Sequence, residues 1–317
     1  MLTTASARQL TSSPPCRSSN LEVCPLSKTV SLIIVNYNAC ECIVACVSSA
    51  LSQVDEVIVV DNASSDDSLA QLEAAFPYDS KVQIIRNYRN LGFAAACNIG
   101  AEASTGSCLF FLNPDCVLTP DSVSHLLRVL DDCTDVGMAG GLLVNPDGTE
   151  QAGGRRAIPT PWRSFVRAFG LSRFANRWPR LFFDFHLHTQ PLPAHPIEVE
   201  AISGACMLIR RAAMQDVGHW DEGYFLHCED LDFSMTLRRK GWKIMFVPDA
   251  RVVHYKGSCS RARPIFVEWH KHCGMMRFYR KFFQHQYPGP LMWLVALGIW
   301  LRFGLVATYH SALRILR

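Results

Sequence analysis

Five acidic residues lie within the stretch 221–232, and two of them, Glu229 and Asp230, are adjacent. The run 229–240 carries apolar residues four positions apart and ends at Gly241, which predicts a helix with the acidic pair in its first turn. Acids at that place can simply complement the helix dipole. Because five acids exceed what capping requires, we favour a second interpretation, in which a carboxylate stays ionised there and accepts a proton from a substrate hydroxyl.

Polar side chains also follow four short apolar runs, which are Val30–Val35, Glu56–Val60, Val82–Ile85 and Cys108–Leu112. The runs alternate with helical stretches at 39–52 and 93–104, which predicts an α/β fold with a mostly parallel sheet and helices on both faces. Ligands bind beyond the carboxyl ends of such strands. Each polar residue there could be an ordinary turn or cap residue, but four such ends in succession favour a polar nucleotide pocket. The residues at these ends are Asn36, Asn38, Asp61, Asn62, Asn87, Asn90, Asn113 and Asp115.

Two common phosphate-binding signatures are absent from the sequence. No GxGxxG follows the first strand, and no GxxxxGK[ST] occurs at any position. Dinucleotide binding of the Rossmann type and P-loop phosphate binding therefore lack their main sequence support.

The second half of the chain continues the pattern of buried strands. Residues 199–211 are expected to form a strand entered through a turn at Ser203 and Gly204. A further strand, Lys243–Val247, leads to Asp249 and then to His254. A lone histidine after an apolar pair is usually structural, so His254 by itself predicts no metal site.

The charges of the 317-residue chain are unevenly distributed. The formal net charge is +3, but residues 251–317 hold 11 Lys or Arg against one acid, and residues 1–250 carry a net −7. Residues 155–180 hold seven Arg and no acid, interleaved with aromatic residues. Such asymmetry indicates an anionic partner, either nucleic acid or a membrane surface.

The cysteines and the N-terminal segment indicate the cellular compartment of the protein. The 13 cysteines include no CxxC pair, which disfavours a zinc site and favours buried thiols in a reducing compartment. Residues 1–28 are rich in Ser, Thr and Pro and lack an apolar core of signal-peptide length, so we expect a disordered leader and a cytosolic-facing protein.

The C-terminal region favours the membrane over nucleic acid. Between Leu291 and Tyr309 the only charged residue is Arg302, while Trp293, Trp300 and Tyr309 are spaced like interface anchors. This length is borderline for a spanning helix, so an interfacial helix is preferred over a span, and a helix packed on the catalytic domain is a third alternative. The basic and aromatic segment 155–185 fits the same surface or, less well, single-stranded nucleic acid.

An ordered set of motifs resembles family 2 glycosyltransferases of the GT-A fold, close to the bacterial rhamnosyltransferase-like branch. The motifs are SLIIVNYN at 31–38, EVIVVDNASSDDS at 56–68, NLGFAAACNIG at 90–100, FLNPD at 111–115, SGACMLIRR at 203–211, WDEGYFLHCEDLDF at 220–233, LRRKGW at 237–242 and VVHYKGS at 252–258. The strand motifs are weak individually, but the ordered set with HCEDLDF is highly specific. The resemblance implies a disordered leader at 1–28, a GT-A domain at 29–258 with an acceptor-side segment at 155–190, and a helical, membrane-associated region at 259–317.

The resemblance also implies roles for individual residues. Asp230 matches the inverting catalytic base, with Glu229 beside it. Asn113-Pro114-Asp115 stands where the family has an Asp-x-Asp metal motif, so Asp115 and His254 would hold Mg²⁺ or Mn²⁺, with one carboxylate fewer than the usual motif. Asp61 would contact the nucleobase. The other donor-side positions are Asn36, Asn38, Asn90, Gly92, Asn98 and Asn113, and the acceptor-side positions are Ser203, Gly204, Trp220 and Asp221.

The implied activity is transfer of a sugar, L-rhamnose from dTDP-rhamnose, to a hydroxyl of a lipid-linked or surface-glycan acceptor at the cytoplasmic face of the cell membrane. Two alternatives remain open at this point. The donor could be another UDP- or GDP-sugar, or the chain could be a non-catalytic, nucleotide-sugar-binding scaffold in a glycan-assembly complex. A nucleic-acid partner is not expected, since no binding motif is present and the body of the chain is acidic.

Overall fold

A computed structural model describes residues 28–175, 177, 178, 180–183, 185, 187–257 and 263–315. The predicted leader lies outside these residues except for Lys28. The predicted domain boundary at 258 also falls outside them, so the division of the chain into domains stays a prediction.

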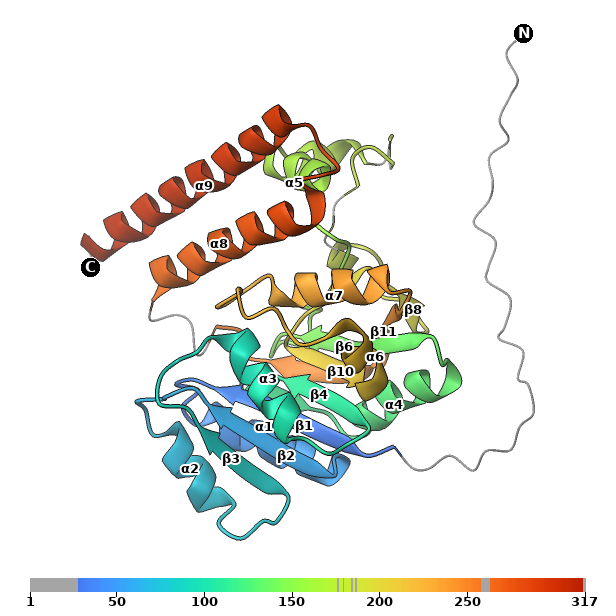
Figure 1. The fold of residues 1–317 in the computed structure, drawn as a ribbon, viewed down its shortest axis with the longest axis vertical. Helices are drawn as coiled ribbons and strands as arrows, with labels where there is room; N and C mark the ends of the chain where they lie inside the picture. The colour runs from blue at the N-terminus through green and yellow to red at the C-terminus, as the bar shows by residue number, and fades with distance from the viewer. Residues whose placement is uncertain are drawn as a thin grey trace.

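In the described part of the chain, a nine-stranded mixed sheet forms the centre of the structure (Figure 1). Its order is β3-β2-β1-β4-β10-β6-β11-β5, and β8 pairs with β11. The strands are β1 (Val30–Asn36), β2 (Glu56–Asp61), β3 (Val82–Arg86), β4 (Cys108–Leu112), β5 (Cys116–Leu118), β6 (Val136–Val144), β8 (Ile197–Glu198), β10 (Cys206–Arg210) and β11 (Lys243–His254). A two-stranded sheet is formed by β7 (Arg155–Arg156) and β9 (Ala201–Ile202).

The first four long strands confirm the predicted parallel arrangement. Strand β1 runs parallel to β2 and β4, and β2 runs parallel to β3, so their carboxyl ends meet at one edge. Strand β10 is antiparallel to both β4 and β6, and β5 is antiparallel to β11. The predicted turn at Ser203 and Gly204 is present and leads into β10, while the residues before it form the short strand β9.

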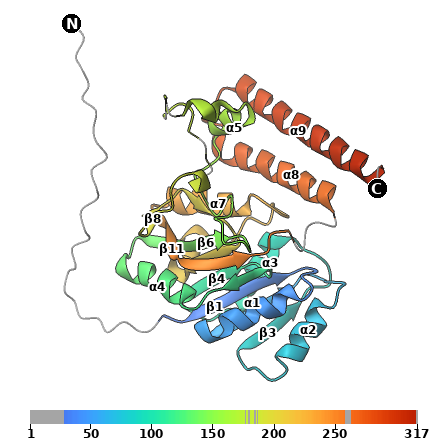
Figure 2. The same ribbon diagram turned by 180° about the vertical axis from the view of Figure 1, so that it is seen from behind.

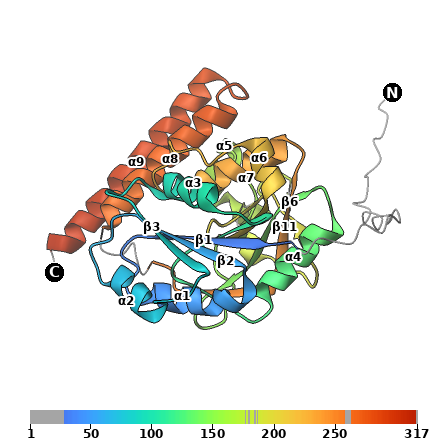
Figure 3. The same ribbon diagram turned by 60° about the horizontal axis from the view of Figure 1, so that its bottom comes forward.

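Helices cover both faces of the sheet, as the alternating pattern predicts (Figure 3). Buried side chains of α1 (Cys42–Ala50), α2 (Ser68–Ala75) and α4 (Ser122–Asp132) belong to one apolar core. Those of α3 (Phe93–Ala103), α6 (Arg211–Val217) and α7 (Glu229–Arg239) belong to the other. Short 3₁₀ turns lie at Leu51–Gln53, Leu171–Phe174 and Leu187–Thr189. No disulfide joins the cysteines of the described residues.

The C-terminal helices stand apart from the sheet, beyond α7 (Figures 1 and 2). They are α8 (Pro264–Phe283) and α9 (Gly289–Ile315), which run side by side, with α5 (Pro161–Ala168) next to them. The stretch Gly289–Leu313 is long and apolar enough to cross a membrane. Its mean hydropathy is 1.8, and only 6% of its apolar 18-residue window is buried. The long apolar helix expected from the sequence is therefore present.

The basic segment is less of a free cationic surface than its sequence suggests. Arg155 is 2% exposed, and its guanidinium bonds both carboxylate oxygens of Glu150, with Nε–Oε1 at 2.8 Å, and the Gln190 carbonyl at 2.9 Å. Arg163 makes an ion pair with Glu200 at 2.6 Å. At least two of the seven arginines therefore hold loops together.

Replacing Arg155 by Ala should destabilise the fold by roughly 3–5 kcal/mol, because it leaves the Glu150 carboxylate and a backbone carbonyl without their buried partner. Chemical denaturation followed by circular dichroism measures this difference. The Arg173→Ala variant is the matched control, since Arg173 is exposed and rests on Phe174. Equal stability of the two variants would show that the buried ion pair contributes little.

Candidate active site

A large cleft runs along the carboxyl ends of the parallel strands and up to the C-terminal helices. Its cavity volume is about 2010 Å³. The strand-end loops and the start of α7 line its floor, and α5, α8 and α9 line its upper part. Ten of the residues given site roles by the family resemblance line it, namely Asn38, Asn90, Gly92, Asn113, Asp115, Ser203, Gly204, Glu229, Asp230 and His254.

Two other predicted donor residues lie beneath the floor. Asn36 Nδ2 donates to Asp61 Oδ1 at 2.8 Å and to Ser68 Oγ at 2.9 Å, and both Asn36 and Asp61 are buried. The other Asp61 oxygen accepts the Ser64 N–H at 3.2 Å. These bonds fix the loop after β2, while the neighbouring Asn62 is the residue that lines the cleft.

Asn62 in turn fixes the next loop. Its Nδ2 donates to Asn90 Oδ1 at 3.1 Å and to the Gly92 carbonyl at 3.0 Å, and its Oδ1 accepts from Asn87 Nδ2 at 3.0 Å. Gly92 has φ +90°, and a Cβ there would meet the Phe225 carbonyl at 2.8 Å, so only glycine fits. The polar strand ends thus form a preorganised floor in which side chains bond mainly to one another.

Three further predicted residues do not line the cleft. Asn98 Nδ2 donates to the Trp220 carbonyl at 3.0 Å, and the Trp220 N–H donates back to Asn98 Oδ1 at 2.9 Å. The Trp220 ring is buried and stacks on Phe233 with centroids 4.5 Å apart. Asp221 binds Arg277 at 2.7 Å and Lys281 at 2.9 Å, which ties the loop before α7 to α8. The positions of these three side chains are those of structural residues.

The acidic pair opens α7, as predicted. His227 and Cys228, just before it, both have left-handed backbone angles, with φ of 68° and 71°. Such angles are uncommon for residues other than glycine and cluster at functional sites. They place Glu229 and Asp230 side by side under the cleft.

The two carboxylates have different surroundings. Burial and the neighbouring Asp230 charge raise the pKa of Glu229 to about 8, and among the described residues its Oε2 has no hydrogen-bond partner. Glu229 is therefore mainly protonated at neutral pH, because burial outweighs the helix dipole.

Asp230 is surrounded by donors. Its Oδ2 makes an ion pair with Arg156 and accepts the Gly204 N–H at 3.2 Å, and its Oδ1 accepts the Leu231 N–H at 2.8 Å. These contacts fix the position of the Asp230 carboxyl group at the start of α7. Arg156 is a site residue that the sequence analysis placed only in the basic segment, since the residues are 74 positions apart.

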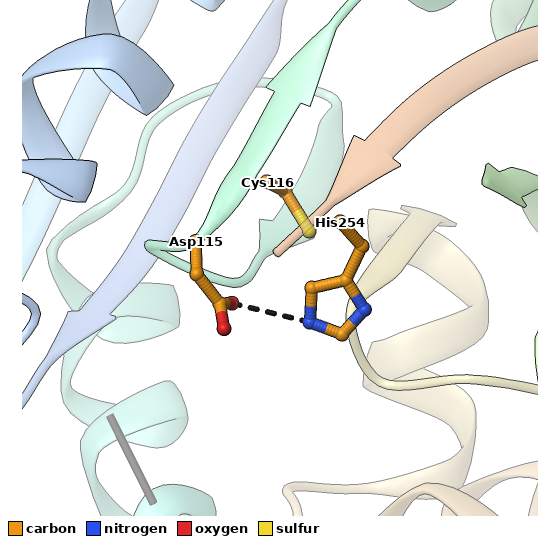
Figure 4. Close-up of side chains that lie close together, drawn as sticks. All are labelled: Asp115, Cys116 and His254. Carbon is orange, nitrogen blue, oxygen red and sulfur yellow. Dashed lines mark ion pairs between the residues drawn. The ribbon is translucent and has the colours of Figure 1, made fainter. Parts of the chain in front are cut away.

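A second cluster joins the loop after β4 to the end of β11 (Figure 4). His254 Nε2 lies 3.2 Å from Asp115 Oδ1, and both side chains are buried. Ligand atoms of Asp115, Cys116 and His254 all lie within 4.8 Å of one another. Burial and the Asp115 charge raise the pKa of the Cys116 thiol well above its ordinary value, and its Sγ points to the Ala205 carbonyl at 3.5 Å, so the thiol stays protonated.

The tautomer of His254 tests whether this cluster fits a cation. Gln151 Nε2 donates to Asn145 Oδ1 at 3.0 Å and to the His254 carbonyl at 3.2 Å, so its Oε1 is left to accept from His254 Nδ1 at 2.7 Å. In a neutral ring, the Nε2 lone pair would then face the Asp115 carboxylate. Two hydrogen-bond acceptors 3.2 Å apart repel each other unless a second ring proton or a cation lies between them. A histidine whose other ring N–H donates to a fixed acceptor, as Nδ1 of His254 does to Gln151, is the usual arrangement of a metal ligand.

Glu229→Gln should change stability and leave most activity, because an amide resembles the neutral carboxyl. In the wild type the native state holds this proton more tightly than the unfolded state, so stability should fall as pH rises from about 5 to about 8. The Glu229→Gln variant should lack the share of this pH-dependent loss of stability that comes from the Glu229 carboxyl. Thermal unfolding of both proteins across this pH range measures it, and parallel curves would contradict the assigned protonation state.

Comparisons with known proteins show the family of the chain. Residues 31–218 match the family described as glycosyl transferase family 2. The N-acetylglucosaminyl-diphospho-decaprenol L-rhamnosyltransferase of Mycobacterium tuberculosis is 28% identical over 281 residues, which are 85% of this chain and 88% of that protein. A low-salt glycan biosynthesis hexosyltransferase of Haloferax volcanii, Agl10, is 26% identical over 68% of this chain and 63% of its own.

Solved structures share the fold. A Pyrobaculum calidifontis mannosyltransferase in complex with GDP-Man and Mn²⁺ gives a TM-score of 0.55 at 13% identity, covering 92% of this chain and 81% of its own. GalNAc-T7 with UDP, GalNAc and Mn²⁺ gives 0.54 at 18% identity, covering 84% of this chain and about half, 54%, of its own. The predicted GT-A fold is confirmed. The chain is a nucleotide-sugar glycosyltransferase and belongs to glycosyl transferase family 2.

Proposed function

We propose that the chain is an inverting, metal-dependent transferase in which Asp230 is the catalytic base. The single observation that carries this proposal is that Asp230 and the Asp115–His254 pair line one cavity. In an inverting transfer the acceptor oxygen forms a bond to the anomeric carbon as the bond from that carbon to the diphosphate oxygen breaks. The hydroxyl proton passes to an Asp230 oxygen.

The surrounding residues prepare Asp230 for this step. Arg156 and the Gly204 N–H both bind Asp230 Oδ2, and the left-handed residues before α7 fix its position.

Asp115 and His254 would hold the divalent cation, Mn²⁺ or Mg²⁺, which when bound offsets the charge of the departing diphosphate. Gln151 keeps His254 in the tautomer that such a role needs. The Pyrobaculum mannosyltransferase and GalNAc-T7 were both solved with Mn²⁺, which supports this assignment.

We further propose L-rhamnose, carried by dTDP, as the donor sugar and a lipid-diphosphate-linked sugar as the acceptor, supported by the name of the mycobacterial relative. A panel of dTDP-, UDP- and GDP-sugars with Mn²⁺ or Mg²⁺ tests this, scored by thermal shift and by nucleoside diphosphate release with an N-acetylglucosaminyl-diphospho-lipid. Preference for a UDP- or GDP-sugar would overturn the donor. Binding without release under every condition would favour the scaffold alternative.

We also propose that α9 holds the enzyme at the cytoplasmic face of the membrane. Trp293 is 79% exposed and Leu297 is 55% exposed on this helix. Arg277 and Lys281, which lie upstream of this helix, are paired with Asp221, so the apolar surface of α9 carries the proposal. Flotation with anionic vesicles tests it, and a protein that stays wholly soluble at low salt would refute it.

A further inference from the structure

The cleft has a larger volume than ligand pockets usually have. Ligand pockets usually enclose about 300–1,000 Å³, whereas this cavity holds about 2010 Å³. Its floor carries the strand-end amides and carboxylates described above. Its upper part is lined mainly by aliphatic and aromatic side chains of α5, α8 and α9. The two parts are continuous, so a single ligand can reach from one to the other.

One stripe of α9 forms a wall of the upper part. The residues of α9 that line the cavity recur every three or four positions, as one face of a helix must, and are Leu291, Leu294, Val295, Gly298, Ile299, Leu301, Arg302 and Leu305. Leu294 is 64% exposed and Leu305 is 74% exposed. Trp293 and Leu297 do not line the cavity. The helix thus has an apolar face toward the cleft that is separate from the residues proposed to meet the membrane.

A second part of the apolar lining comes from α5 and the residue after it. Trp162 stacks on Phe165 with ring centroids 5.5 Å apart, and Phe165 contacts Phe169 at 4.5 Å. All three rings line the cavity and are 44–64% exposed. Exposed aromatic and leucine side chains that line one cavity form a seat for an extended apolar ligand.

Cationic side chains lie within the same cavity. Arg302, the only charged residue between Leu291 and Tyr309, lines it beside Lys271 and His272. Arg302 Nη1 lies 3.5 Å from Glu268 Oε2, and Lys271 Nζ lies 3.3 Å from Glu268 Oε1. Two cations for one acid leave a positive surplus, which complements a diphosphate.

We propose that the apolar part of the cleft, between α5, α8 and α9, seats the isoprenoid chain of a diphosphate-linked acceptor. The chain lies along Leu294 and Leu305, the diphosphate meets Lys271 and Arg302, and the sugar reaches Asp230. This assignment rests on the proposed function. It adds that the apolar side chains of α5, α8 and α9 are the surface that contacts the lipid. A bilayer alone does not explain the cavity, because the apolar wall faces the catalytic carboxylates in one continuous space.

Equilibrium binding of farnesyl diphosphate and methyl diphosphate tests the assignment without any transfer step. The full-length protein should bind the farnesyl compound more tightly. The Leu294→Gln/Leu305→Gln variant should lose about tenfold in farnesyl affinity and keep its methyl diphosphate affinity, since only apolar contact is removed. The Trp293→Gln/Leu297→Gln variant is the matched control and should bind both compounds as the wild type does.

An equal loss in the two double variants would overturn the proposal in favour of non-specific contact with the apolar surface of α9. Farnesyl and methyl diphosphate binding with equal affinity in the wild type would also overturn it. Failure of the proposed function shows itself differently, as the absence of sugar transfer in the nucleotide-sugar panel, and leaves this binding measurement intact.

Discussion

Asp230→Asn should lower the rate of sugar transfer by on the order of 10²- to 10⁴-fold, the usual contribution of a positioned general base. An amide at this place cannot accept the hydroxyl proton, although it keeps the shape of the side chain. Binding of the donor should survive, because the strand-end loops that line the floor of the cleft do not depend on Asp230. Single-turnover transfer and donor titration by thermal shift measure the two effects separately.

The variant also leaves Arg156 without its partner, so lost stability has to be separated from lost chemistry. Arg156 is half of the ion pair with Asp230, and among the described residues its Nε has no hydrogen-bond partner. The double variant Asp230→Asn/Arg156→Gln removes the isolated charge and should recover stability while transfer stays lost. Transfer at the wild-type rate by folded Asp230→Asn would exclude Asp230 as the base.

The sequence predicted those parts of the site that depend on local pattern. The strand ends are set by short apolar runs, and the acidic pair is set by helix periodicity, so both could be located without a structure. The polar residues there did gather at one edge, as the parallel arrangement of β1, β2 and β4 requires. Which of them line the cleft could not be predicted, because Asn36, Asp61 and Asn98 bond other parts of the chain instead.

The missed residues depend on contacts between distant parts of the chain. Gln151 is 103 positions from His254, and Arg156 is 74 positions from Asp230. Arg156 lies on β7, a strand of two residues, which is too short to leave a periodic signal. The charge count of the segment 155–180 indicated a positive surface, but only the fold shows that Arg155 is buried while Arg156 pairs with Asp230.

The second large effect is expected at the cation site. Asp115→Asn should abolish the Mn²⁺-dependent stabilisation by a nucleoside diphosphate and lower turnover by on the order of 10³, the value of several kcal/mol of lost charge stabilisation. The neutral amide removes the charged ligand while the loop after β4 keeps its backbone bond from the Asn113 N–H to the Ala205 carbonyl at 3.0 Å. Thermal shift with and without Mn²⁺ separates this loss from a general loss of stability.

Two variants of neighbouring residues decide whether the effect belongs to the cation. Cys116→Ala lies in the same cluster but removes a protonated thiol, so the Mn²⁺ response should persist. Gln151→Met should weaken Mn²⁺ binding about 10- to 100-fold without touching a ligand, because His254 then loses the bond that fixes its tautomer. A normal response in Gln151→Met would show that the ring needs no such support. Loss of the response in Cys116→Ala would instead make the thiol a ligand and remove the reason for assigning the site to Asp115 and His254 alone.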